Sequence, residues 1–478
     1  MKKLIFTCSL LALFSCSDDF LDVPLEDRTP AEEFFVSQED AIEATNAIYN
    51  QQLAWENSGF PYLAITEITS DNTEKGSNPG DAAFLNDFNN FTFSSSAFVF
   101  NDYWTGQYRG INLANQVITN VPDISMDEDL KARLIAEAKF FRGYHYFNLV
   151  RAFGGVPIYD GIPEDGLYNL PRNSEEEVYN FVISNLQDAA EDLPASYSAG
   201  NTGRVTQAAA KGFLAKVYMY QENWNQVLTL TQEVMGMGYE LYPDYYELFR
   251  WQNEYNSEII LTINSTADGN CQANSQFGQV QGVRGQFGWG FNSPTEDLAA
   301  AYEEQDVRRD ASILFVGETT PEGDLITAGD DPSNPQRYNQ KIYVSSEFFR
   351  RNNCQENSDS NIVLLRYAEI LLMNAEANME LGNIEAAQES LNAVRNRAGL
   401  EDVDVTDQQQ LRMAIWHERR VELAMEGDRF FDLVRQGRAA EVLQANGAQF
   451  TAGVNEVFPI PANQISLSNG MLEQNPGY

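Results

Sequence analysis

The sequence predicts a mostly α-helical protein, built from tetratricopeptide-like helical repeats and interrupted by a large irregular insertion with short strands. Two observations predict the repeats. Apolar residues recur every three or four positions over several long stretches, and two pairs of these stretches form helical hairpins with small residues where the helices meet. A third observation predicts the insertion, because residues 237–359 lack this periodicity and are rich in Gly, Asn and Gln. A helical scaffold with an irregular polar segment is expected when loops carry the function.

The first residues have the layout of an export signal. Two lysines precede a short apolar run that ends at Ser15 and Cys16. This run is too short to span a bilayer, and no other stretch reaches about 18 uninterrupted apolar residues. We therefore predict a lipoprotein signal over residues 1–15, an acylated Cys16 and a lipidated acidic tether over residues 16–36. The alternative is an ordinary signal peptide with a chance cysteine at its edge.

The composition is that of a strongly acidic globular protein. With 478 residues, 43% of them hydrophobic, the chain can bury a sizeable core in one large or two merged domains. Its 70 acidic residues and 31 basic residues give a formal net charge of -39 at pH 7. This charge disfavours nucleic acid, anionic lipid surfaces and sulfated or uronate-rich polymers as partners. Cys271 and Cys354 lie outside the signal, and whether they pair stays open.

Residues 37–236 are predicted to form an N-terminal helical part. Ser37 with Asp40, and Ser174 with Glu177, have the spacing of N-terminal capping pairs. The predicted helices cover residues 39–53, 130–153, 207–221 and 225–235, and a further helix begins at Ser174.

The remaining chain is predicted to contain an irregular part and a second helical part. Residues 71–81 have no periodicity and predict an exposed loop. The insertion over residues 237–359 contains strand-like pieces such as residues 259–263. The C-terminal helical part and tail cover residues 360–478. Its predicted hairpin consists of residues 362–381 and 384–398.

The sequence contains no recognisable catalytic pattern. His145 and His417 are the only histidines, and His145 lies on the apolar side of its helix, as a core residue would. Glu418 follows His417 as in zinc proteases, but position 421 is Val and the second ligand is missing. The charged residues between 418 and 429 are interpreted as a paired network that fixes the C-terminal helices. We expect no enzymatic activity, and no pattern indicates a cofactor or metal.

Short segments spread over nearly the whole chain follow one known pattern. They are residues 20–24, 136–147 (AEAKFFRGYHYF) leading to 153–157, 204–206, 365–369, 418–423, 427–433 (GDRFFDL), 459–461 and 474–478. Each segment is weak alone. All of them in this order, behind a lipoprotein signal, resemble the SusD/RagB family of nutrient-binding outer-membrane lipoproteins.

This resemblance implies a SusD-like fold, in which tetratricopeptide-like helical pairs wrap a variable region. It also implies a lid-like position on a SusC-like TonB-dependent transporter, and binding of oligosaccharides, or of peptides in the RagB branch. The lipid on Cys16 would hold the protein in the outer membrane, facing the cell exterior. The expected partners are therefore a glycan, the transporter and the membrane, and nucleic acid is excluded by the charge.

The insertion contains the side chains that a neutral sugar needs. Aromatic rings stack on the C–H face of a sugar, and amide or charged groups bind its hydroxyls. Burying about 100 Å² between a ring and a sugar contributes about 2.5 kcal/mol, whereas micromolar binding needs about 8 kcal/mol, so two or three rings are required. The candidates in the insertion are Phe277, Arg284, Gln286, Phe287 and Trp289.

Trp289 is the first candidate, because glycan-binding members of the family that the chain resembles carry a stacking tryptophan before the corresponding helix. The alternative is that Trp289 is a hydrophobic plug under the loop. The resemblance also places a second sugar-contacting loop at residues 71–81, which here has no tryptophan. The candidates in that loop are Asp71, Asn72, Lys75 and Asn78.

Four functions stay open at this point: a glycan receptor, a peptide receptor, a glycoside hydrolase using two of the many carboxylates, and a scaffold that holds other proteins. The acidity favours a neutral polymer such as a β-glucan or mannan. Of the other tryptophans, Trp104, Trp224 and Trp416 are expected in the core, and Trp55 and Trp251 are undecided.

Overall fold

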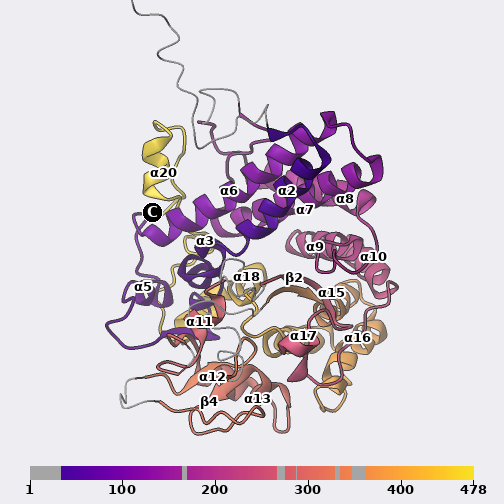
Figure 1. Cartoon of the computed structure of the whole chain (residues 1–478). Helices are drawn as coiled ribbons and strands as arrows, with labels where there is room; N and C mark the ends of the chain where they lie inside the picture. Colours follow the sequence, from indigo (N-terminus) through magenta and orange to yellow (C-terminus); the bar gives the residue numbers. More distant parts are fainter. Residues whose placement is uncertain (1–33, 164–168, 266–274, 287, 329–333, 347–360) are drawn as a thin grey trace, which may run out of the picture.

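The computed structural model describes residues 34–163, 169–265, 275–286, 288–328, 334–346 and 361–478 (Figure 1). Over these residues the protein is mostly helical and contains small two-stranded sheets. The predicted fold class is therefore confirmed. Other predictions fall outside the described residues: the signal, Cys16, most of the tether, Cys271, Phe287 and Cys354.

Long helices form most of the structure. They are α2 (Gln38–Gln51), α6 (Phe98–Asn120), α7 (Glu128–Phe153), α8 (Glu175–Asp192), α9 (Gln207–Tyr220), α10 (Trp224–Met235), α15 (Tyr367–Glu380), α16 (Ile384–Arg397) and α17 (Gln408–Glu422). Each packs against the next, from α6 through α7, α8, α9 and α10 to α15 and α16. The insertion separates α10 from α15 in sequence, yet these two helices pack on each other, so the helical stack is continuous (Figure 1).

The shorter elements lie between these helices and after them. The short helices are α3 (Trp55–Ser58), α4 (Phe60–Leu63), the π-helical η2 (Ala64–Ile68), α5 (Leu85–Asn90), η3 (Val121–Asp123), η4 (Glu247–Phe249), η5 (Trp251–Asn253), α11 (Phe277–Gln281), α12 (Glu296–Ala301), α13 (Arg308–Ser312), α18 (Arg429–Arg435), α19 (Ala439–Ala445) and α20 (Ala462–Leu467). The strands are β1 (Thr73–Gly76), β2 (Ile259–Ile263), β3 (Phe291–Pro294), β4 (Ile313–Phe315), β5 (Arg337–Asn339) and β6 (Ile362–Arg366). The pairs β1–β3, β2–β6 and β4–β5 are antiparallel.

Helix ends follow the signals that the sequence carries. The Ser37 hydroxyl accepts the backbone N–H of Asp40, and the Asp40 carboxylate accepts the N–H of Ser37 at 2.7 Å. Ser174 and Glu177 form the same capping box at the start of α8. Helix α7 ends before Gly154, whose φ of 71° suits glycine. Local signals of this kind made these boundaries predictable.

Two predictions about local structure were wrong. Residues 362–366 were predicted to begin a helix, but they form β6, which pairs with β2. The helix begins only at Tyr367. Residues 71–81 were predicted to be an exposed loop, but they contain β1 and their first residues are largely buried. In both cases the partners are distant in sequence, so no local pattern revealed them.

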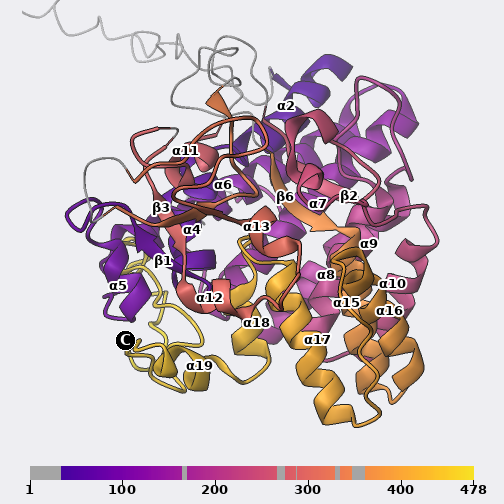
Figure 2. The ribbon, with the colours of Figure 1, turned by 90° about the horizontal axis from the view of Figure 1, so that it is seen from below.

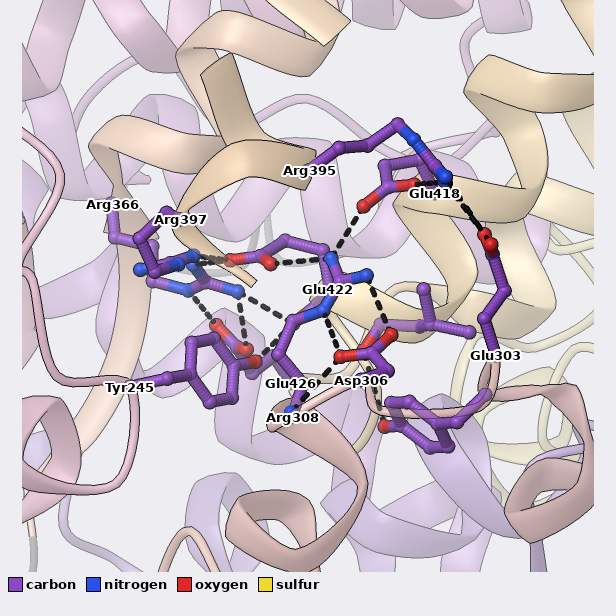
Figure 3. A network of polar contacts seen from close by, with 12 residues as sticks. Tyr245, Glu303, Asp306, Arg308, Arg366, Arg395, Arg397, Glu418, Glu422 and Glu426 are labelled. Carbon is purple, nitrogen blue, oxygen red and sulfur yellow. Dashed lines mark hydrogen bonds and ion pairs between the residues drawn. The ribbon is translucent and has the colours of Figure 1, made fainter. Parts of the chain in front are cut away.

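A network of buried ion pairs joins the insertion to the C-terminal helices (Figure 3). Glu422, at the end of α17, lies at its centre with no exposed side-chain surface. Its carboxylate accepts hydrogen bonds from Arg308 at 2.9 Å and from Arg366 and Arg397. Burial alone would raise the pKa of Glu422, but the three guanidinium groups outweigh burial and hold the pKa well below its ordinary value.

The network extends to both sides of Glu422. Arg366 also pairs with Glu258 at 2.7 Å and with Glu426 at 2.8 Å. Arg308 also pairs with Glu418 at 2.5 Å. The interpretation of the C-terminal charged residues as a paired network is therefore confirmed. The sequence did not show that several of the partners come from the insertion.

We expect Glu422→Gln to lower the free energy of unfolding by about 3–5 kcal/mol, because it leaves three buried guanidinium groups short of a counter-charge. Urea unfolding at pH 7, followed by circular dichroism, measures this loss. The matched control is Glu389→Gln on the exposed face of α16, which should change the free energy by less than about 0.5 kcal/mol. Equal losses in the two variants would contradict the central role of Glu422.

Candidate functional site

Strands β1 and β3 bring together the two segments that were predicted to hold the ligand. β1 lies within residues 71–81, and β3 follows Trp289, with Gly76 opposite Phe291. Gly76 has a φ of 68°, and a Cβ atom there would lie 2.4 Å from the carbonyl oxygen of Gly290. Only glycine permits this close approach of the two backbones. Figure 2 shows β1, β3, α5 and α11 grouped on the side of the molecule opposite α10 and α16.

Asp71 and Asn72 lie at the base of this group and are buried. The Asp71 carboxylate accepts two hydrogen bonds from Arg429, at 2.7 and 2.8 Å, and pairs with Arg420 at 3.0 Å. The Asn72 side-chain oxygen accepts a hydrogen bond from Arg420 at 2.9 Å. Burial and these contacts leave little of either side chain for a ligand. Their positions favour a structural role over the predicted sugar contact.

Lys75 is also buried and holds the following turn together. Its ammonium group donates to the backbone carbonyls of Gly76, Asn78 and Asp81 at 2.8, 2.7 and 2.9 Å. An ammonium group has three donors, so all of them are used within the protein. The position of Lys75 therefore also favours a structural role. Asn78 is half-buried on the same turn.

Arg284 connects the turn to the insertion. Its guanidinium group pairs with Asp81 at 2.7 Å and donates to the Ser77 hydroxyl at 2.7 Å. The side chain is 26% exposed and that of Asp81 is 41% exposed, so both remain within reach of a ligand. Gln286 is exposed, and its amide bonds to the backbone of Leu325 and Thr327 at 2.9 Å each.

Aromatic side chains of residues 55–98 and of the insertion form a chain of ring contacts that we call the aromatic patch. Trp289 is half-buried and lies 6.5 Å from Trp55 and 6.4 Å from Phe60, measured between ring centroids. Phe60 contacts Phe84 at 5.8 Å, and Phe84 contacts Phe98 at 4.7 Å. Phe98 is 46% exposed, so the rings run from a half-buried tryptophan to the surface. The aromatic patch consists of Trp55, Phe60, Phe84, Phe98 and Trp289.

Two further rings of the insertion, Phe277 and Phe291, are buried. Phe291 contacts Phe60 at 4.7 Å, and Phe277 contacts Tyr62 at 6.2 Å. Phe277 is only 5% exposed, so its position does not favour the predicted stacking on a sugar in the aromatic patch. Phe291 instead packs against Phe60 of the patch, whereas Phe277 packs against Tyr62, which lies outside the patch.

Most rings of the aromatic patch were not identified from the sequence. Trp55 was undecided, and Phe60, Phe84 and Phe98 were not considered. Phe84 and Phe98 belong to a phenylalanine-rich run, but this signal is ambiguous because Phe88 and Phe100 in the same run are core residues. Of the other tryptophans, Trp104 lies in the core as expected, and Trp224 and Trp416, expected there too, are half-buried.

His145 has the predicted core role. It is fully buried and makes hydrogen bonds with Gln52 at 3.0 Å and Gln107 at 2.8 Å. Burial lowers its pKa to about 3, so the ring is neutral at physiological pH. Within the described part of the chain, no group of three or more His, Cys, Asp and Glu residues is placed to hold a metal ion. Among the helices of that same part, none is both long and apolar enough to cross a bilayer.

Two family models match the chain and together cover most of it. The model of the SusD family matches residues 173–478. The model described as "Starch-binding associating with outer membrane" matches residues 19–219. The charged residues that hold β1 and those that surround Glu422 lie within these matches.

Individual relatives match the chain over nearly its whole length. SusD-like protein P2 of Formosa agariphila is 29% identical, over 100% of this chain and 99% of its own length. A solved structure described as a laminarin binding SusD-like protein has a TM-score of 0.82 and 31% identity, covering 93% of this chain and 100% of that one. Surface glycan-binding protein A from Bacteroides thetaiotaomicron, solved in complex with laminarihexaose, shares the fold with a TM-score of 0.80, 23% identity, and coverage of 92% of this chain and 100% of that one. This chain belongs to the SusD family.

Proposed function

We propose that this protein binds a neutral glycan of the β-glucan class at the aromatic patch, without catalysing its cleavage. The observation that carries the proposal is the run of rings from half-buried Trp289 and Trp55 to exposed Phe98. Micromolar affinity requires about 8 kcal/mol, and each ring contributes about 2.5 kcal/mol, so the aromatic patch is large enough. Laminarin is a neutral β-glucan, and the relative described as binding it is 31% identical to this chain.

The surrounding polar residues then have two roles. Arg284 and Asp81 lie beside the turn with partly exposed side chains, where they can bind sugar hydroxyls. Asn78, Gln286 and Phe287 remain candidates for further contacts. The backbone next to Arg284 and Asp81 is held in place by Asp71, Asn72 and Lys75, as their buried contacts indicate. The net charge of -39 supports a neutral rather than an anionic polymer.

The proposal includes delivery of the glycan to a SusC-like TonB-dependent transporter. The protein would be held in the outer membrane by a lipid on Cys16 and would face the cell exterior. Membership of the SusD family and the signal-like first residues support this location. A RagB-like peptide receptor is the alternative, and it is less favoured because the described relatives bind glucans.

We expect Trp289→Ala to weaken the binding of laminarihexaose at least about tenfold in isothermal titration calorimetry, because one of the two indole rings of the aromatic patch is lost. The melting temperature should change little, since Trp289 is only half-buried. The control is Trp224→Ala, which removes a half-buried tryptophan on α10 and should leave binding intact. A large drop in stability for Trp289→Ala, with binding retained, would show that Trp289 is a plug. Binding of peptides but not of any glucan would favour the RagB-like alternative.

We expect Asp71→Asn to lower the free energy of unfolding while glycan binding is retained in the folded protein. Burial alone would raise the pKa of Asp71, but Arg429 and Arg420 hold it below the ordinary value of 3.8. The stabilisation is therefore fully present above about pH 3.8 and is lost as the pH falls through the lower pKa of the folded state. Urea unfolding at pH 7, 5 and 3 should show a difference from wild type that is similar at pH 7 and 5 and smaller at pH 3. Unchanged stability with lost glucan binding would instead indicate a direct sugar contact.

A further inference from the structure

The structure also contains a pocket. Its described lining includes none of the residues of the aromatic patch. Its wall includes Phe277 of α11, Tyr343 and residues of β2 and β6. The lining mixes aromatic and aliphatic side chains with polar and charged ones, which is the mixture that a sugar needs.

Two exposed aromatic side chains lie at the outer end of this pocket. Trp251 is 41% exposed and Tyr255 is 42% exposed, and both line the pocket. The Tyr255 ring packs on the backbone of Gly203, where an added Cβ atom would lie 2.9 Å from the ring. Tyr255 also has a φ of 58°, which is uncommon for a residue other than glycine. The ring is thus presented to solvent from a defined position, as a stacking platform would be.

The pocket is also lined by a buried carboxyl group, that of Glu67, one of whose oxygens has no hydrogen-bond partner among the described residues. Glu67 is 2% exposed and lies on the π-helical segment η2, a rare conformation that is frequent at functional sites. Its Oε1 atom accepts the N–H of Gly427 at 2.6 Å, and its buried Oε2 atom has no hydrogen-bond partner among the described residues. Burial raises the pKa of Glu67 to about 8, so at neutral pH the carboxyl group is protonated and can donate a hydrogen bond.

The two cations in the described lining use most of their donors within the protein. Lys341 donates to the carbonyl oxygen of Glu422 at 3.0 Å and to Glu426 at 2.6 Å. Arg250 donates to the carbonyl oxygens of Gln340 and Tyr343 at 2.6 and 3.3 Å. The buried Nε–H of Arg250 has no hydrogen-bond partner among the described residues, so the lining offers one further donor to a ligand oxygen. A purely apolar ligand would leave the buried Glu67 oxygen unsatisfied.

We propose that this pocket is a second glycan-binding site, which takes the end of a neutral saccharide chain. Trp251 and Tyr255 stack on the sugar rings, and Glu67 exchanges a hydrogen bond with a hydroxyl of the innermost ring. This inference rests on the proposed function, because it assumes that the protein is a glycan receptor. Because the pocket and the aromatic patch share no lining residue, a short ligand occupies each site independently.

The test is isothermal titration calorimetry of the full chain with laminaritriose, a probe short enough to favour separate occupation of the two sites. Wild type should bind two equivalents. The double variant Trp251→Ala/Tyr255→Ala and the single variant Trp289→Ala should each bind one, with the affinity of the altered site lowered at least about tenfold. Both altered residues of the double variant are more than a third exposed, so its melting temperature should stay close to that of wild type.

The controls separate the two proposals. Leu467→Ala on α20 removes an exposed apolar side chain outside both sites, and this variant should bind two equivalents. Gly203→Ala displaces the Tyr255 ring without altering it and should weaken the same equivalent as the double variant. One equivalent in wild type, lost in Trp289→Ala and kept in the double variant, overturns the second site while the proposed function stands. No binding of any glucan by wild type overturns both proposals.

Discussion

The three arginines around Glu422 are the constraint on which the rest of the structure depends. A buried carboxylate is costly unless opposite charges reach it, and Arg308, Arg366 and Arg397 come from three different parts of the chain. Arg308 lies on α13 of the insertion, Arg366 ends β6, and Arg397 ends α16. The network therefore holds the irregular insertion against the helical stack, so that its pockets have a defined shape.

A second set of buried charges applies the same principle to the region of β1 and β3. Arg420 lies on α17, two residues before Glu422, and Arg429 begins α18. Both reach Asp71, and Arg420 also reaches Asn72, so residues just before β1 are tied to the C-terminal helices. β1 then fixes β3, and β3 fixes the position of Trp289. The buried contacts of Asp71, Asn72 and Lys75 thus favour a structural role on the backbone near Trp289, in place of the predicted sugar contact.

Those elements whose ends are set by local interactions could be predicted from the sequence. The helices with capping boxes and glycine stops were predicted, whereas β6 and residues 71–81 were not, because their partners lie far away in the chain. Helix α6 was missed for a related reason: it has no side-chain cap and contains Gly106 and Gly110. Gly110 disfavours a helix locally, but a Cβ atom there would lie 2.0 Å from the His145 ring, so packing requires the glycine.

The candidate site was predictable only where family resemblance supplied the position, as for Trp289. The exposure of a tryptophan depends on tertiary packing, so the sequence left Trp55 and Trp251 undecided. Trp55 belongs to the aromatic patch, whereas Trp251 lines the separate pocket. The separation of the two proposed sites would affect how the protein binds long and short chains. Under the proposed function, each site would bind a short chain reversibly, which would allow release to a transporter. A polymer that reaches both sites gains avidity from effective concentration, so capture of long chains and release of short ones can coexist in one protein.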